Sequence, residues 1–192
     1  MKIDYKALFV RAWSLIVRPR QTWEEIMQES PRKEVGTTFV WPLICLCGMA
    51  VLIGGVIRDG FADGAFWETM ADSCIQCVVL FGSFYFVAGG LNMLRVRYQK
   101  ADDDMPLCTL FAGYAMVVVF ALALLTALFP SLLLFKLVLQ FYVVYIVWQG
   151  ADLVLGVDEE RRMTFSLVAS AIILLVPFIL QFIFDKLSLL LA

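Results

Sequence analysis

Long apolar runs make up most of the chain, and short charged segments separate them. Each run has about 20 or more residues, which at ~1.5 Å per residue reaches across the ~30 Å hydrocarbon core of a bilayer. A helix is the expected structure for such a run, because it pairs the backbone groups within the run, and a backbone group left unpaired in lipid costs several kcal/mol. The pattern therefore predicts an all-α membrane protein with five transmembrane helices, at about residues 37–57, 73–94, 107–129, 132–155 and 164–184.

The third and fourth runs almost touch, so the break between them must be sharp. Pro130 disfavours helical geometry at Phe129, and Ser131 can cap the helix that follows. This pattern predicts a tight helical hairpin rather than one very long helix.

Residues 1–36 precede the first run and begin with an amphipathic pattern. On a helical wheel, Arg11, Ser14 and Arg18 lie on one face, and apolar and aromatic side chains lie on the other. Pro19 is expected to end this helix. The apolar face consists of Tyr5, Leu8, Phe9, Ala12, Trp13 and Ile16.

A second short helix is expected to follow, because residues 22–25 resemble a capping box in which Thr22 is the cap. Pro31 would stop this helix before the first span. The two helices can lie at the cytoplasmic membrane interface or pack on the cytoplasmic ends of the bundle, and the sequence leaves both placements open. The candidate surface for lipid or a protein partner consists of Trp13, Arg18, Pro19, Arg20 and Trp23.

Composition supports a membrane protein and argues against several chemistries. The chain is 62% hydrophobic and 17% charged, whereas soluble domains are about 45–50% apolar and about 25% charged. It has no histidine, which is the commonest general base and metal ligand. Nucleophile-elbow, zinc-protease and phosphate-loop motifs are absent from the sequence. We therefore expect no enzymatic activity, no cofactor or metal, and no nucleic-acid partner.

Basic residues predict the orientation. Twelve of the 15 Lys and Arg residues fall in segments 1–36, 95–106 and 156–163, which lie on one side of a five-span bundle. The positive-inside rule then places the N-terminus in the cytoplasm and the C-terminus outside, in the cytoplasmic (inner) membrane. Of the remaining basic residues, Lys136 is expected to snorkel to the outer surface.

Polar residues inside spans are the best pointers to function in a membrane protein. Asn92, Tyr114, Gln149 and Asp152 are predicted at similar depth and, with Gly113, form a candidate intramembrane polar site. They either fix packing through interhelical hydrogen bonds or bind a lipid, ion or proton. The sequence also places Gln76, Gln140 and Gln181 within spans.

Several short motifs lie before the first run and in the third and fourth runs, at Pro19, Trp23, Ile26, Gly113, Tyr114, Tyr145 and Gly150. They resemble the Yip family, whose members span the membrane five times and carry the Yip-one domain. The resemblance implies the fold, an N-inside topology and a role in membrane organisation, and it implies no catalytic residue. The family is named for interaction with Ypt/Rab GTPases, but this chain is similar to its compact bacterial branch, so Rab binding does not carry over.

Three functions are compatible with this sequence. The first is a non-enzymatic scaffold or adaptor that contacts the lipid bilayer and an unidentified membrane or cytoplasmic protein. The alternative is a small transporter or channel with a polar site near Asn92, Tyr114 and Asp152. A lipid-modifying enzyme is the third, although no clustered acid and nucleophile supports it. Small residues at packing spacing favour seams within the chain, with a homo-oligomer as the other option.

Overall fold

The computed structural model describes residues 5–29, 35–61 and 64–191, which form helices, turns and short connections without a strand. Two short helices come first and are called the lead here. The helices are α1 (Tyr5–Val17), α2 (Pro19–Gln28), α3 (Trp41–Asp59), α4 (Ala65–Leu94), α5 (Met105–Ala115), α6 (Val117–Leu128), α7 (Leu133–Leu139), α8 (Tyr142–Leu155) and α9 (Glu159–Leu191). Wide π-type turns precede α3 at Gly36–Val40 and follow α4 at Arg95–Gln99.

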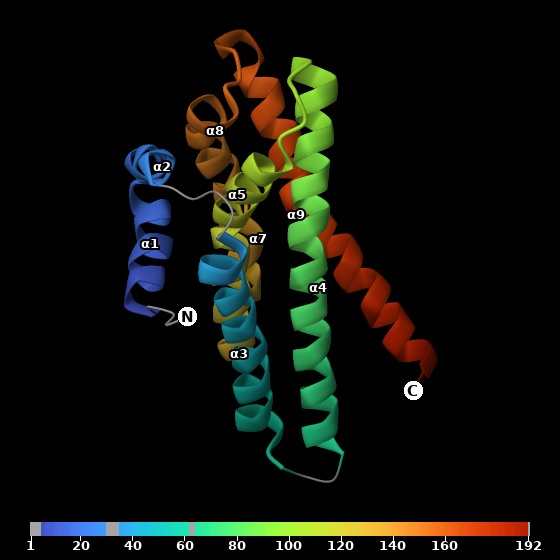
Figure 1. Ribbon diagram of the computed structural model, residues 1–192. Coiled ribbons are helices and arrows are strands. Elements are labelled where there is room, and N and C mark those ends of the chain that lie inside the picture. The colour runs from blue at the N-terminus through green and yellow to red at the C-terminus, as the bar shows by residue number, and fades with distance from the viewer. Residues whose placement is uncertain (1–4, 30–34, 62–63, 192) are drawn as a thin grey trace.

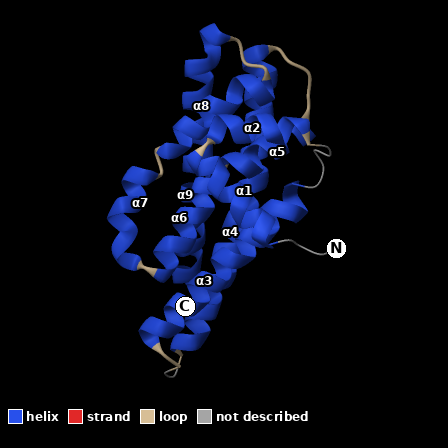
Figure 2. Cartoon of the chain, turned by 90° about the vertical axis from the view of Figure 1, so that its left-hand side faces the viewer, coloured by secondary structure: helices blue, strands red, loops and turns tan. Residues whose placement is uncertain are grey.

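The long helices run side by side between two ends of the bundle (Figure 1). The α3–α4 connection lies at one end, called the hairpin end, and the α6–α7 break lies toward this end but short of it (Figure 2). The α4–α5 and α8–α9 connections lie at the opposite end, called the lead end, near α2. Within the described residues, four helices are long and apolar enough to cross a membrane, and a fifth span results if α7 and α8, bent by 43°, count as one. The predicted all-α membrane fold is confirmed.

The fourth predicted span contains a break that the sequence analysis did not anticipate. The predicted break at Pro130 is present, since α6 ends at Leu128 and a 3-10 turn covers Pro130–Leu132. Ser131 lies inside this turn and does not cap α7. A second break separates α7 from α8 at Gln140 and Phe141, where backbone hydrogen bonds shorten to i→i−3.

Several helices extend beyond the apolar runs that predicted them. α4 starts at Ala65 rather than residue 73, and α9 covers Glu159–Leu191 rather than 164–184. A helix can continue past the lipid because its backbone groups stay paired along its own axis. The α3–α4 connection is therefore short, with positive φ angles of 69° at Gly60 and 89° at Gly64, where glycine has no steric cost.

The lead forms the two predicted helices, but its second helix starts differently. α2 begins at Pro19, and the hydroxyl of Thr22 donates to the Arg18 carbonyl at 2.9 Å inside the helix, so the predicted capping box does not form. Pro31, the expected stop, lies outside the described residues. α1 runs alongside the bundle, whereas α2, seen nearly end-on in Figure 1, lies across the direction of the spans.

The packed core lies toward the lead end. Phe84, Phe111, Phe120 and Phe165 are fully buried there, at the junction of α4, α5, α6 and α9. Toward the hairpin end, α9 diverges from α4 (Figure 1), and α7 stands to one side of its neighbours (Figure 2). The bundle therefore combines a closely packed half with a more open one.

Candidate functional site

Trp23 anchors the lead in the bundle. Its side chain is 0% exposed, and its indole Nε1 donates to the backbone carbonyl of Ile146 at 3.2 Å. Its ring stacks on Phe111, with centroids 5.0 Å apart and an interplanar angle of 15°. Gly150 lies beneath the ring, where a Cβ would come within 2.6 Å of Trp23. A hydrogen-bonded tryptophan over a glycine thus joins α2 to α8 and α5.

Gly113 and Tyr114 extend this junction to the first span. The Tyr114 ring meets the edge of Trp23 at 6.1 Å and packs on Phe39 at 4.7 Å. A Cβ on Gly113 would lie 2.9 Å from the side chain of Val40. The Gly113-Tyr114 pair therefore lets α5 approach the start of the first span and the lead closely.

Polar contacts also fix the lead. The hydroxyl of Tyr142, at the start of α8, donates to the carbonyl of Ile16 in α1 at 2.7 Å. Arg11 of α1 forms an ion pair with Glu29, just after α2. Of the two placements that the sequence left open for the lead, the structure shows packing on the bundle.

The predicted lipid or partner surface on the lead divides into buried and exposed parts. Pro19 and Trp23 are buried against the bundle and present no free surface. Trp13 is 68% exposed, and Arg18 and Arg20 are also exposed. A contact role for these three exposed residues stays a prediction.

Asp152 of the predicted polar site is paired with a cation. Its carboxylate lies 3.0 Å from Arg162 of α9, whose guanidinium also donates to the Trp148 carbonyl at 2.7 and 3.0 Å and lies over the Trp148 ring. Oδ1 of Asp152 and Oε1 of Gln149 are buried, and neither has a hydrogen-bond partner within the described part of the chain. This cluster links α8 to α9 at the lead end.

Asn92 belongs to a different set of contacts. Its amide donates to Asp103 at 2.9 Å, and its oxygen accepts a long hydrogen bond from the thiol of Cys108. Asn92, Tyr114 and Asp152 therefore have separate neighbours in the structure, at the α4–α5 connection, at Trp23 and at Arg162. A functional role for them stays a prediction.

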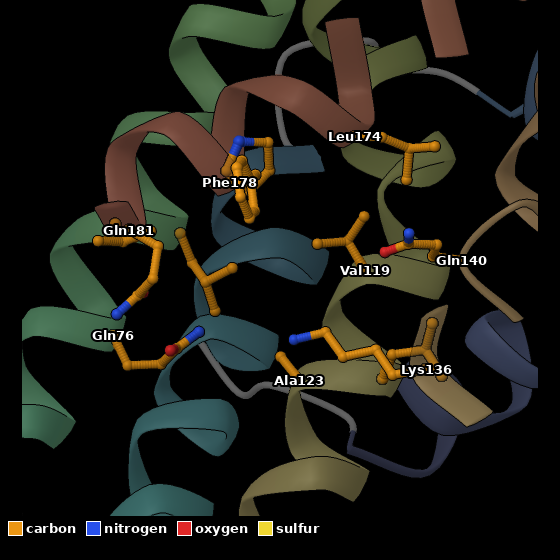
Figure 3. Close-up of a pocket in the computed structure, with 12 residues that line it drawn as sticks. Gln76, Val119, Ala123, Lys136, Gln140, Leu174, Phe178 and Gln181 are labelled. Atoms are coloured by element: carbon orange, nitrogen blue, oxygen red, sulfur yellow. The ribbon is translucent and has the colours of Figure 1, made fainter. Parts of the chain in front are cut away.

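A polar cavity lies between α4, α6, α7 and α9. The sequence alone did not predict it. Its volume is about 190 Å³, and Gln76, Lys136, Gln140 and Gln181 line it among apolar side chains. Lys136 turns into this cavity (Figure 3), and its expected snorkelling to the outer surface stays a prediction. Each residue stood out in the sequence as a polar group within a span, but only the packing of four helices shows that they converge.

These observations define a class of protein: a multi-pass helical membrane protein with a docked N-terminal lead. The Yip1 domain family model matches residues 13–180, from within the lead to the last span. The chain belongs to this family. No curated protein and no solved structure matches the chain.

Proposed function

We propose that the protein is a non-catalytic membrane scaffold that inserts α1 into the cytoplasmic leaflet. The observation that carries this proposal is the two-sided character of α1. Leu8 and Leu15 are buried against the bundle, and α1 contacts α6 in the third span. The opposite side exposes a continuous set of large apolar residues, namely Tyr5, Phe9, Val10, Trp13 and Val17.

The neighbours of α1 support a position within the bilayer rather than on its surface. Tyr5, at the first turn, lines a groove with Cys45 and Met49 of α3. The first span begins at Gly36. At ~1.5 Å per residue, Met49 lies roughly 20 Å farther along the helix axis. The start of α1 therefore lies beside the interior of the first span.

The charges of the lead beyond its first turn fit this arrangement, and Lys6 in that turn is exposed. Arg11 is neutralised by Glu29, which lowers the cost of burying it beside lipid. Arg18, Arg20 and Glu24 are exposed at the other end of α1 and on α2, where the interface would lie. The excess of basic residues at the lead end favours a cytoplasmic location. A helix inserted into one leaflet adds area to that leaflet alone, which is a means of organising or curving a membrane.

Photo-crosslinking in native membranes tests this proposal. A photoreactive amino acid at Phe9 or Trp13 should form adducts with the acyl chains of phospholipid, whereas the same group at Arg20 or Glu24 should form far fewer, because α2 would lie at the level of the headgroups. A water-exposed α1 would give no lipid adducts at Phe9, and that result would overturn the proposal. Protein adducts at Phe9 would also overturn it, because a partner rather than lipid would then cover this face.

The same experiment examines the proposed protein partner. We propose that the exposed basic residues Arg18 and Arg20 contact a cytoplasmic protein. A specific protein adduct at position 20 that is lost when Arg18 is changed to Glu would support this contact.

A further inference from the structure

The polar cavity described above continues to the hairpin end. A second cavity of about 230 Å³ reaches Arg58 at the end of α3 and Pro130 after α6. The two cavities share Gln76, Ala123 and Lys136 in their walls. The polar groups of the bundle interior are thus connected to the end of the bundle where lipid headgroups lie if the spans cross a bilayer.

Three polar side chains in this cavity lack protein partners. Within the described residues, the side chains of Lys136, Gln76 and Gln140 make no hydrogen bond or ion pair. Figure 3 shows Lys136 and Gln76 directed toward each other from opposite walls. A lysine ammonium has donors only, so a group bound between these residues must carry acceptor oxygens. A phosphate meets this requirement and also balances the charge of Lys136, which is half-buried.

Carboxylates lie next to the cavity on its hairpin-end side. Asp72 is one helical turn from Gln76 on α4, and Asp185 is one turn from Gln181 on α9, so each shares a face with a cavity residue. The Gln181 amide donates to Asp185 at 2.8 Å. Asp72 and Asp185 are close enough to interact electrostatically. A purely anionic headgroup would be repelled by these two carboxylates, whereas an ammonium group next to the phosphate would be attracted.

The opposite side of the cavity is apolar and open toward lipid. Leu174 and Phe178 of α9 and Val119 of α6 line the wall nearer the centre of the bundle. α7 forms one side of the cavity and exposes most of its apolar residues, with Leu134 75% exposed. Helix breaks at both ends of α7 leave it without a continuous helical connection to α6 or α8. Acyl chains can therefore reach the cavity between α7 and α9.

We propose that this cavity binds a phospholipid whose headgroup carries a primary ammonium, the phosphatidylethanolamine class. The phosphate lies between Lys136 and Gln76, and an ester carbonyl accepts from the Gln140 amide. The ammonium faces Asp72 and Asp185, and the acyl chains follow the apolar wall. The residues that line this cavity differ from those of the groove beside α1, so its test is independent of the scaffold function proposed above.

Native mass spectrometry of the full chain tests the site. The protein is reconstituted in equal amounts of dioleoyl phosphatidylethanolamine, phosphatidylglycerol and phosphatidylcholine, and the lipid retained after gentle release is identified. Phosphatidylethanolamine should be retained preferentially. Lys136→Met should lower its occupancy by about tenfold, the loss of one charge-assisted contact. Lys186→Met is the matched control, because Lys186 is exposed on α9 and does not line the cavity, and it should leave occupancy unchanged.

A double variant separates the phosphate from the ammonium contact. Asp72→Asn with Asp185→Asn should keep bound lipid but reduce the preference for phosphatidylethanolamine over phosphatidylglycerol. Unchanged occupancy in Lys136→Met would overturn the proposal. Equal retention of the three lipids by the unmodified protein would do the same, as would preferential retention of added free oleate, which has no ammonium.

Discussion

The two halves of the fourth predicted span, α7 and α8, have similar apolar sequences but different surroundings. In α8, Val143, Ile146 and Val147 are fully buried among α2, α5 and α9. In α7, Leu134 and Val138 are more than two-thirds exposed, and the helix makes few contacts with the bundle. Hydrophobicity alone therefore shows that a segment enters lipid, but it does not show which segment packs on protein. Gly150 contributes to the packing of α8, because its lack of a side chain leaves room for the Trp23 ring.

The largest loss of stability is expected where α2 of the lead packs against the closely packed half of the bundle. Trp23→Ala removes a buried ring and its hydrogen bond to Ile146, and should lower the free energy of unfolding by about 3–5 kcal/mol. It should also expose the chain to protease near Arg18 and Arg20. Trp67→Ala in α4 is the control, since this tryptophan is 66% exposed and lies outside the lead, so its replacement should cost about 0.5 kcal/mol or less. Thermal unfolding in nanodiscs and limited proteolysis measure both effects. Equal losses in the two variants would contradict the anchoring role of Trp23.

A somewhat smaller loss of stability is expected when a side chain is added at Gly150, beneath the Trp23 ring. In Gly150→Ala, the new Cβ would lie 2.6 Å from Trp23 and 2.9 Å from Phe111, which forces the rings to move. Overpacking of this kind costs about 1–3 kcal/mol. Gly89→Ala in α4 is the matched control, because its Cβ would meet no atom within 4 Å. If Gly150→Ala leaves both the unfolding temperature and the protease pattern unchanged, the α2–α8 junction is looser than the structure indicates.

The sequence predicted the parts of this molecule that depend on local pattern. The all-α membrane fold, the two lead helices and the break at Pro130 each follow from apolar run length or from proline, whose effects act within a few residues. The break at Gln140 and Phe141 was missed because neither residue is a helix breaker. Trp23 was placed on a surface because a short amphipathic helix presents the same pattern to a membrane interface and to a protein groove.

The predicted polar site and the cavity between α4, α6, α7 and α9 consist of different residues for a related physical reason. Depth can be estimated from position along a span, and Asn92, Tyr114 and Asp152 were grouped on that basis. Rotation about each helix axis decides which polar groups face one another, and this depends on packing between helices that are distant in sequence. The convergence of Gln76, Lys136, Gln140 and Gln181 required that information. The residues were identified as polar groups in spans, but their common cavity was not predicted.

The smallest loss of stability is expected in α7, and its measurement tests the comparison between α7 and α8 directly. Leu134→Ala removes side-chain atoms that already face outward, so burial changes little and the free energy of unfolding should change by about 0.5 kcal/mol or less. The matched change in α8, Ile146→Ala, opens a cavity in the packed half and should cost about 2–5 kcal/mol. Thermal unfolding of both variants in the same nanodiscs gives the difference. A large loss in Leu134→Ala would mean that α7 packs against a protein surface, such as a second copy of the chain, and the lipid-access route between α7 and α9 would then be closed. A small loss of stability in Leu134→Ala, together with an unchanged preference for phosphatidylethanolamine, would support α7 as a lipid-facing wall of the cavity. α7 would then shape the cavity by its location beside it, without packing on other protein.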